Sequence, residues 1–219
     1  MIEMLKENYF NLTNRTEKIR FWLEQCNQMK SHYPFSFQDS GSALIVLDMQ
    51  NYFLDKSSHA YIPASDAILV PIQNLIKYFR AIHRPTIFTR HIASLDETDL
   101  MNQWWRDSIQ ESNPRSEISQ LLDSQMGIIL KKSKYSAFQN TSLDEILKQN
   151  HVNQLVICGV MTHLCCESTI RDAFMHNYQA FFVVDGTATY TEQLHLGSLR
   201  AISHGFGKCV ASEEIINGK

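Results

Sequence analysis

Two adjacent cysteines, Cys165 and Cys166, carry the strongest chemical signal in this chain. They follow an apolar run at 155–158 and a glycine, in a pattern that predicts a buried strand, a turn and the start of a helix. Unpaired N–H groups and the positive end of the dipole at a helix N-terminus favour a thiolate, so they lower the pKa of a cysteine there. We therefore predict a cysteine nucleophile at this turn.

Two further reactive side chains follow predicted strands. Asp48 ends an apolar run that begins at residue 43, and Lys134 follows the run at 127–131. Ligands of open α/β sheets bind at the carboxyl ends of the strands, where Asp48, Lys134 and Cys165 would meet. Taken singly, the aspartate could cap a turn, the lysine could be solvated and the cysteine could be a core thiol. Their coincidence at one edge of one sheet indicates a site.

These residue types are sufficient for covalent catalysis. A carboxylate near a thiol can take its proton, and a neighbouring ammonium keeps that carboxylate ionised. Backbone N–H groups at the start of the following helix can bind the oxyanion of a tetrahedral intermediate. The chemistry therefore requires neither a metal nor another cofactor.

Short apolar runs alternate with helical patterns along most of the chain. Strands are predicted at residues 43–50, 86–90, 127–131, 155–158, 180–184 and 209–211. Helices are predicted at 14–30, from 71, at 143–149, at 164–175 and from 191, and a long polar loop at 91–123. This alternation, with mostly short connections, indicates an open parallel α/β sheet. Residues 1–39 are predicted to form a helical arm and connector, and residues 40–219 the domain that contains the sheet.

The composition favours a small molecule as the partner. A net charge of −3 and a pI near 6.3 leave no excess of Lys and Arg for a nucleic-acid-binding face. The apolar runs are shorter than the roughly 20 residues of a membrane span, and residues 1–8 carry acids early instead of an apolar signal core. We expect a cytoplasmic protein without nucleic-acid or membrane partners. The five cysteines show no zinc spacing and no disulfide framework.

Three blocks of sequence carry a resemblance. They lie at 44–53 (LIVLDMQNYF), 132–138 (KSKYSAF) and 159–173 (GVMTHLCCESTIRDA). Together they resemble the isochorismatase-like cysteine hydrolases, a superfamily that includes nicotinamidases, N-carbamoylsarcosine amidases, ureidoacrylate amidases and isochorismatases. The resemblance implies a three-layer αβα sandwich with a six-stranded, mostly parallel sheet, and the catalytic trio Asp48, Lys134 and Cys165. It also implies a cis peptide bond between Val160 and Met161, which would aim N–H groups of Met161 and Cys165 at the oxyanion.

The resemblance also bears on the reaction. Counting from the start of the third block, the nucleophile is Cys165, and Cys166 is a packed neighbour. Isochorismatases usually lack this thiol and hydrolyse a vinyl ether, so Cys165 favours hydrolysis of a small carboxamide or ureido-type C–N bond through a thioester. The pair Thr162-His163 resembles isochorismatases, so a vinyl-ether hydrolase that uses Asp48 as the acid is the alternative. A non-catalytic ligand-binding relative would be expected to lose one of the trio, and a redox pair of adjacent cysteines would be strained.

Aromatic and histidine side chains in the predicted edge loops could select the substrate, although simple packing would explain them equally well. Nicotinamidases carry an Asp-x-His metal motif after the second strand, whereas this chain has Arg90-His91-Ile92, which argues against a metal and weakens the case for nicotinamide. The candidate substrate-binding residues are Phe53, His91, Trp104, Trp105, Tyr135, Phe138 and His163. The amphipathic arm and the aromatic loop favour a homo-oligomer, a dimer or a tetramer.

Overall fold

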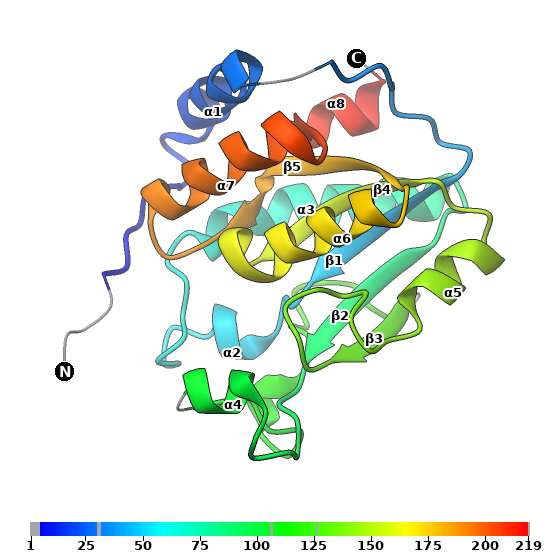
Figure 1. Ribbon diagram of the computed structural model, residues 1–219. Helices are drawn as coiled ribbons and strands as arrows, with labels where there is room; N and C mark the ends of the chain where they lie inside the picture. The colour runs from blue at the N-terminus through cyan, green and yellow to red at the C-terminus, as the bar shows by residue number, and fades with distance from the viewer. Residues whose placement is uncertain (1–4, 30–31, 106, 126, 219) are drawn as a thin grey trace.

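One six-stranded sheet forms the centre of the molecule (Figure 1). The computed structural model describes residues 5–29, 32–105, 107–125 and 127–218. The strands are β1 (Ser42–Leu47), β2 (Thr86–His91), β3 (Ile128–Lys132), β4 (Gln154–Val160), β5 (Gln179–Ala188) and β6 (Lys208–Val210). Their order is β3-β2-β1-β4-β5-β6, and every neighbouring pair is parallel. The predicted six-stranded parallel sheet is confirmed.

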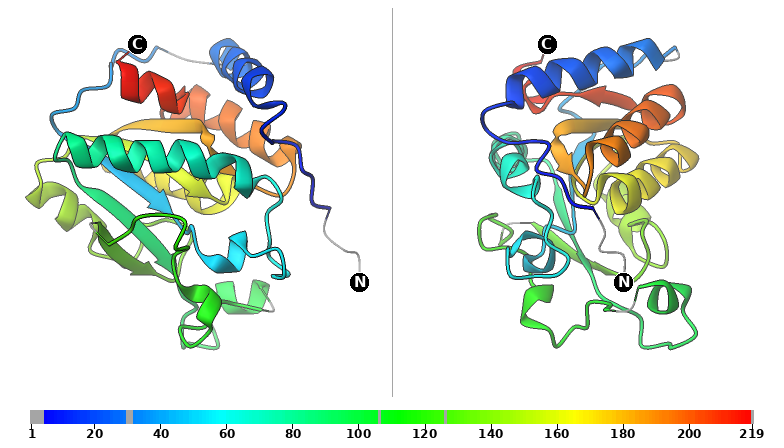
Figure 2. Two further views of the ribbon diagram at one scale, coloured as in Figure 1. Left: turned by 180° about the vertical axis from the view of Figure 1, so that it is seen from behind. Right: turned by 90° about the vertical axis from the view of Figure 1, so that its left-hand side faces the viewer.

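Helices cover both faces of the sheet (Figure 2). They are α1 (Arg15–Met29), α2 (Asn51–Leu54), α3 (Ser65–Ala81), α4 (Leu100–Trp104), α5 (Leu143–Gln149), α6 (Glu167–Met175), α7 (Glu192–Gly205) and α8 (Ser212–Asn217), with a 3₁₀ turn η1 (Pro114–Ser116) and a π-helical turn η2 (Thr162–Cys166). The helices α3 and α8 lie on one face, and α5, α6 and α7 lie on the other. The predicted three-layer sandwich is therefore confirmed. None of the helices within the described ranges is long and apolar enough to cross a membrane.

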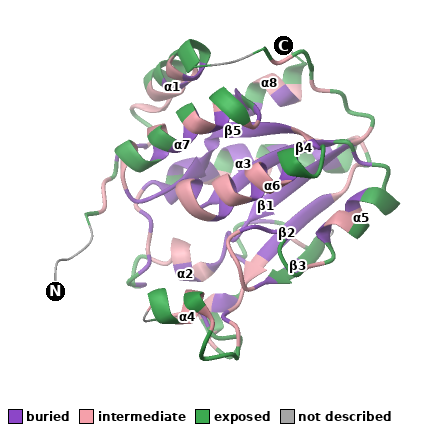
Figure 3. Ribbon diagram, viewed as in Figure 1, coloured by how far each residue is buried: buried purple, intermediate pink, exposed green. Residues whose placement is uncertain are grey.

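The central strands are buried because both faces of the sheet are covered (Figure 3). Every residue of β1 and β4 is buried, which accounts for their continuous aliphatic sequences. In contrast, β3 is an edge strand in which Leu130 and Lys132 are buried while Ile129 and Lys131 are exposed. This alternation decides which lysine of β3 faces the interior.

The N-terminal helix packs on the same molecule. The predicted helix at 14–30 is present as α1, and its last predicted position, residue 30, lies outside the described residues. Trp22 and Cys26 are fully buried in the cluster that also contains the sheet, and Trp22 Nε1 donates a hydrogen bond of 3.0 Å to Glu192 of α7. Lys18 Nζ forms an ion pair of 2.6 Å with the same carboxylate. The domain boundary at residue 39 stays a prediction.

One helix begins earlier than predicted. We expected the regular part of α3 to start near Pro71, but the helix begins at Ser65 and contains Pro71 in its interior. Ile68, Ile72 and Leu75 are all buried, so the apolar face is continuous through the proline. Burial of this face outweighs the local preference of proline for a helix start.

Candidate active site

The carboxyl ends of three strands bring an aspartate, a lysine and a cysteine together. Asp48 directly follows β1 with φ +50°, Lys132 is the last residue of β3, and Cys165 lies in η2 after β4. Lys132 Nζ is 2.7 Å from Asp48 Oδ2 and 3.3 Å from Cys165 Sγ, and it also donates a hydrogen bond of 3.0 Å to the carbonyl of Lys134. The ammonium thus connects the carboxylate and the thiol directly.

A buried hydroxyl fixes the orientation of the aspartate. Thr89 Oγ1 donates a hydrogen bond of 2.6 Å to Asp48 Oδ1 and accepts one of 3.0 Å from the Asp48 backbone N–H. Thr89 belongs to β2, the neighbour of β1 in the sheet. The carboxylate is therefore held from one side by β2 and from the other by the lysine of β3.

The lysine beside Asp48 is Lys132, and the prediction of Lys134 for this position is wrong. Lys134 lies beyond the end of β3, and its Nζ pairs with Asp99 Oδ1 at 2.6 Å. The cause is strand alternation: Leu130 points into the core, so Lys132, two residues on, shares its face. This spacing was the sequence signal that could have identified Lys132.

The aspartate and the lysine form an ion pair in the resting protein. Burial alone would raise the pKa of Asp48, but the adjacent Lys132 ammonium, together with the neighbouring His91 and Cys165 side chains, holds it below its usual range. Burial alone would lower the pKa of Lys132, but the Asp48 carboxylate and Cys165 raise it. Asp48 is therefore ionised, and Lys132 is protonated, near neutral pH.

The nucleophile candidate rests as a thiol, in contrast to our expectation of a lowered pKa. Burial and the adjacent Asp48 carboxylate raise the pKa of Cys165 to about 12, although Lys132 acts in the opposite direction. The Asp48 carboxylate lies beside the thiol, and Lys132 Nζ contacts both groups. Because desolvation outweighs the helix-terminus effect, attack by this sulfur would require a base to take its proton.

These pKa directions predict an unusually broad pH profile. We expect kcat/KM for an uncharged substrate to be constant from about pH 5 to about pH 9, because Asp48 stays ionised above its lowered pKa. The value of kcat/KM should fall below about pH 4, where Asp48 becomes protonated and then the other carboxylates that stabilise the folded protein. Initial rates across overlapping buffers at constant ionic strength would measure this profile. An acid limb near about pH 6.5, typical of histidine, would contradict Asp48 as the base.

The backbone around Cys165 departs from regular helix and strand. The peptide bond between Val160 and Met161 is cis, as the resemblance implied. Residues 162–166 form a π-helical turn, in which the Met161 carbonyl accepts hydrogen bonds from the N–H groups of Leu164 and Cys166, and α6 begins only at Glu167. Met161 and Cys165 both line the adjoining cavity. Their N–H groups stay the predicted oxyanion donors.

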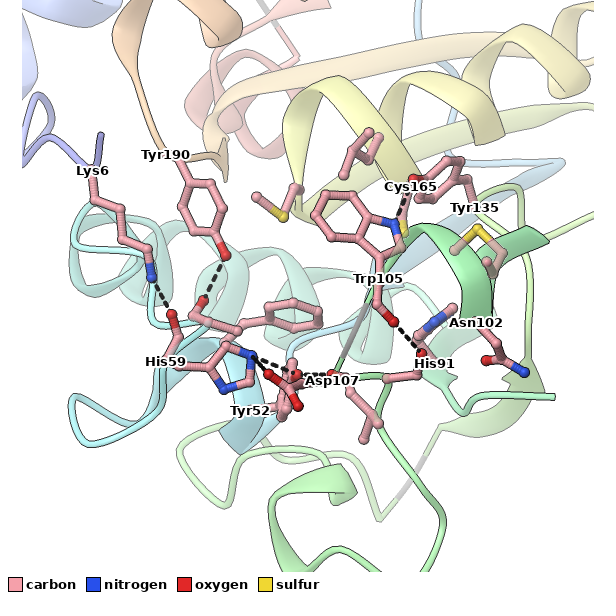
Figure 4. A pocket seen from close by; sticks show the side chains of 17 residues that line it. Lys6, Tyr52, His59, His91, Asn102, Trp105, Asp107, Tyr135, Cys165 and Tyr190 are labelled. Carbon is pink, nitrogen blue, oxygen red and sulfur yellow. Dashed lines mark hydrogen bonds and ion pairs between the residues drawn. The ribbon is translucent and has the colours of Figure 1, made fainter. Parts of the chain in front are cut away.

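A cavity of about 280 Å³ opens at this edge of the sheet, with Cys165 in its wall (Figure 4). Its lining is mainly aromatic and apolar, as in many small-molecule sites. The lining residues are Lys6, Tyr52, Phe53, His59, Ala60, His91, Met101, Asn102, Trp105, Asp107, Ser108, Ile109, Tyr135, Met161, Leu164, Cys165 and Tyr190. The cavity therefore gives a small ligand direct access to the thiol.

Four of the seven predicted substrate-binding residues line this cavity. They are Phe53, His91, Trp105 and Tyr135, and Trp105 Nε1 donates a hydrogen bond of 2.8 Å to Tyr135 Oη. Burial and the charge of Lys132 lower the pKa of His91 to about 4, so its ring is neutral near pH 7.

The other three predicted residues lie outside the cavity lining. Trp104 is 77% exposed on α4. Phe138 is buried and stacks on His176 with ring centroids 4.8 Å apart. His163 Nδ1 is 2.7 Å from Thr189 Oγ1 and faces that strand-end hydroxyl. Exposure or packing against the fold, which the sequence pattern does not resolve, accounts for each of these positions. Contact of the three residues with a substrate stays a prediction.

Sequence reasoning missed several lining residues. Tyr52 lies in the first sequence block, four residues after Asp48, and this proximity was an available signal. Lys6 and Tyr190 come from the N-terminal segment and from the connection between β5 and α7, far away in sequence. The Lys6 ammonium lies 4.6 Å from the centre of the Tyr190 ring. No local pattern marks such residues, because only the fold brings their segments together.

No group of three or more His, Cys, Asp or Glu side chains with the arrangement of a metal site occurs in the part of the chain that the structure describes. Of the two histidines that line the cavity, His91 has Lys132 as a charged neighbour, and this cation disfavours a metal cation nearby. The reactive groups at this site are therefore the Asp48–Lys132 ion pair and the Cys165 thiol.

Comparison with known proteins agrees with this geometry. Residues 42–214 match the Isochorismatase domain. The chain belongs to the isochorismatase family. The matched region contains all six strands and Asp48, Lys132 and Cys165, whereas the arm, including Lys6, precedes it.

Relatives of this isochorismatase-family hydrolase differ in the reactions for which they are named. Nicotinamidase 3 of Arabidopsis thaliana is 34% identical over 179 residues, which cover 80% of this chain and 86% of the relative. Enterobactin synthase component B of Escherichia coli K12 is 29% identical over 185 residues, covering 83% of this chain and 65% of the relative. Among solved structures, a cysteine hydrolase from Pseudomonas syringae superposes with a TM-score of 0.81 at 28% identity, covering 86% of this chain and 96% of that chain. The N-carbamoylsarcosine amidase from Thermoplasma acidophilum superposes with a TM-score of 0.69 at 26% identity, covering 80% and 98%.

Proposed function

We propose that this isochorismatase-family protein is a cysteine hydrolase that cleaves a small carboxamide or ureido-type C–N bond through a thioester. The observation that supports this most is the position of Cys165 Sγ, in the cavity wall and 3.3 Å from Lys132 Nζ, whose ammonium is also 2.7 Å from Asp48 Oδ2. A nucleophile, a base and a cation are thus in contact beside a space for a ligand. Two relatives, the nicotinamidase and the N-carbamoylsarcosine amidase, are named for reactions of amides.

The first half of the proposed reaction forms the thioester. Asp48 takes the proton of Cys165 as the sulfur attacks the carbonyl carbon, and a C–S bond forms while the carbonyl oxygen becomes an oxyanion. The N–H groups of Met161 and Cys165 are the proposed donors to this oxyanion. The oxyanion then re-forms the carbonyl and the C–N bond breaks. The leaving nitrogen takes the proton from Asp48 and departs as ammonia or an amine.

The second half restores the enzyme. Asp48, again ionised, takes a proton from water as the water oxygen attacks the thioester carbonyl. The C–S bond breaks, the sulfur recovers the proton, and a carboxylic acid, or a carbamic acid from a ureido substrate, is released. Lys132 stabilises the ionised form of Asp48 and the developing thiolate, because its ammonium contacts both groups.

A trapping experiment tests the thioester. The protein is mixed with a panel of amides and ureido acids, quenched in acid within the first turnover and digested, and the peptide that contains Cys165 and Cys166 is fragmented in a mass spectrometer. We expect the mass of an acyl group on Cys165 with a turned-over substrate, and an unmodified Cys166. Turnover without any adduct, even at the earliest quench times and with an added amine as competing acceptor, would argue against covalent catalysis.

The second candidate is an isochorismatase-type vinyl-ether hydrolase that uses Asp48 as the acid. One relative supports this alternative. Isochorismatase of Bacillus subtilis is 30% identical over 172 residues, which cover 77% of this chain and 54% of the relative. Incubation with isochorismate distinguishes the two, since the vinyl-ether reaction releases pyruvate and survives loss of the thiol.

Three expectations about the setting of this activity stay predictions. They are a small-molecule substrate as the only partner class, a cytoplasmic location and a homo-oligomer. The helix α1 of the arm contacts α7 of the same chain. Sedimentation of the purified protein would give the number of subunits.

A further inference from the structure

Two buried polar atoms in the cavity wall lack a hydrogen-bond partner among the described residues. They are Oδ1 of Asn102 and Nδ1 of His91, and both residues line the cavity. Buried polar atoms are rarely left without a partner, because their desolvation then has no compensation. Two such atoms in one cavity therefore indicate that a bound ligand supplies their hydrogen-bond partners.

The orientation of the Asn102 amide is determined by its surroundings. Its Nδ2 donates hydrogen bonds of 2.9 Å to the backbone carbonyls of both Ser94 and Asp96. Carbonyl oxygens only accept hydrogen bonds, so the NH₂ group must face them and the amide oxygen must face the other way. Figure 4 shows this oxygen on the side of His91. Asn102 therefore presents an acceptor, and only an acceptor, to the cavity.

The segment that carries Asn102 is fastened at both ends. Asp99 accepts a hydrogen bond of 3.0 Å from the backbone N–H of Met101 and pairs with Lys134 Nζ at 2.6 Å. After the helix, Trp105 Nε1 is bonded to Tyr135 Oη. No residue of α4 is buried, so these contacts, rather than a core of its own, hold the helix over the cavity. Lys134 thus contributes to the position of Asn102, not to the pairing with Asp48.

The two atoms impose a chemical requirement on the ligand. The Asn102 oxygen is an acceptor, so it requires an N–H or O–H donor on the ligand, and it repels a carboxylate or ester oxygen in the same place. The neutral imidazole of His91 can meet either kind of partner, since its proton can occupy either nitrogen. A carbonyl group flanked by N–H provides the donor, whereas an ester does not.

We propose that Asn102 Oδ1 and His91 Nδ1 form a subsite that binds an N–H group next to the scissile carbonyl, so that the substrates are amides or ureido compounds that retain this N–H. The inference rests on the proposed function for the identity of the scissile carbonyl. It adds the residues that distinguish such substrates from esters and from carboxylates. A site built around a hydrogen bond rejects analogues that lack the donor, because its own polar atom is then left unpaired.

The test measures binding in the Cys165→Ala protein, where the thiol chemistry is absent. Calorimetry is carried out with two matched pairs of probes, N-methylbenzamide with methyl benzoate and 1,1-dimethyl-3-phenylurea with phenyl N,N-dimethylcarbamate. Within each pair, the shape is similar and one N–H is replaced by oxygen. We expect the N–H member of at least one pair to bind about tenfold more tightly or better. Failure of the thioester proposal would show in the trapping experiment instead, which does not depend on this binding preference.

Variants of α4 assign the preference to the Asn102 oxygen. Asn102→Leu should remove the tenfold preference, while Asn102→Asp, which keeps an acceptor oxygen but loses both Nδ2 hydrogen bonds, should retain it. Loss of the preference in both variants would indicate that Asn102 only anchors its loop, and would overturn the proposal. Gln103→Leu is the matched control, because Gln103 is an exposed neighbour on the same helix. A preference that survives Asn102→Leu, or an absence of preference in the parent, including no binding of any probe, would also overturn it.

Discussion

Replacement of Lys132 by Met should lower kcat/KM by about 10³-fold or more, whereas replacement of Lys134 by Met should leave kcat within about threefold of the parent value. The reason is the position of each ammonium. Lys132 Nζ is 2.7 Å from Asp48 and contacts Cys165, while Lys134 Nζ is paired with Asp99 beside α4. Steady-state kinetics on any substrate that the parent protein turns over would measure both effects.

The same pair of variants distinguishes catalysis from folding. Without Lys132, the buried Asp48 loses its counter-charge, so its pKa should rise and any residual activity should require a higher pH than in the parent. Lys134→Met should raise KM more than it lowers kcat, because it loosens the wall of the cavity rather than the reacting groups. Circular dichroism and thermal melting would confirm that both variants are folded. Equal losses of kcat in the two folded variants would contradict the assignment of Lys132.

Replacement of Cys165 by Ala should abolish hydrolysis of the C–N bond, with a loss of about 10⁴-fold or more in kcat. The thioester route needs the sulfur, and the remaining Asp48 and Lys132 can then act only on water. The measurement is turnover at saturating substrate with enough protein to detect a trace of activity. Full turnover by Cys165→Ala would exclude the thiol mechanism, and with pyruvate as the product it would support the vinyl-ether alternative.

Cys166→Ala is the matched control for the neighbouring thiol. Cys166 is fully buried and is absent from the cavity lining, and burial raises its pKa well above the usual value for cysteine. We expect kcat/KM within about tenfold of the parent value and a melting temperature lower by a few degrees, about the effect of a small core cavity. A loss as large as that of Cys165→Ala in a folded protein would show that the nucleophile had been assigned to the wrong cysteine.

Most of the fold follows from local sequence patterns. The continuous aliphatic runs before Asp48 and before Gly159 are typical of strands that are buried on both faces, and the structure contains them as β1 and β4. Alternation of such runs with helical patterns leaves few arrangements other than a parallel sheet with helices on both faces. Pro71 shows the limit of local rules, because burial of one helical face extends α3 through it.

By itself, the sequence determined which kinds of reactive side chain form the site, and it placed two of them, Asp48 and Cys165. Asp48 directly follows β1, and Cys165 lies in the turn after β4. The ends of β1 and β4 are neighbours in the sheet, so knowledge of the strand ends is enough to bring these residues together. The first and third sequence blocks carry these residues, which is why the resemblance to the family could be stated before the structure was considered.

Only the tertiary structure decided which lysine joins them, how the thiol is protonated and what forms the cavity. Lys132 and Lys134 differ in side-chain direction and in burial at an edge strand, and both properties depend on neighbouring segments. The thiol at a helix start was expected to be acidic, but burial beside a carboxylate raises its pKa to about 12. Lys6, Asn102 and Tyr190 reach one cavity from three distant segments. Desolvation and long-range contacts of this kind are properties of the packed chain, so no local pattern of residues encodes them.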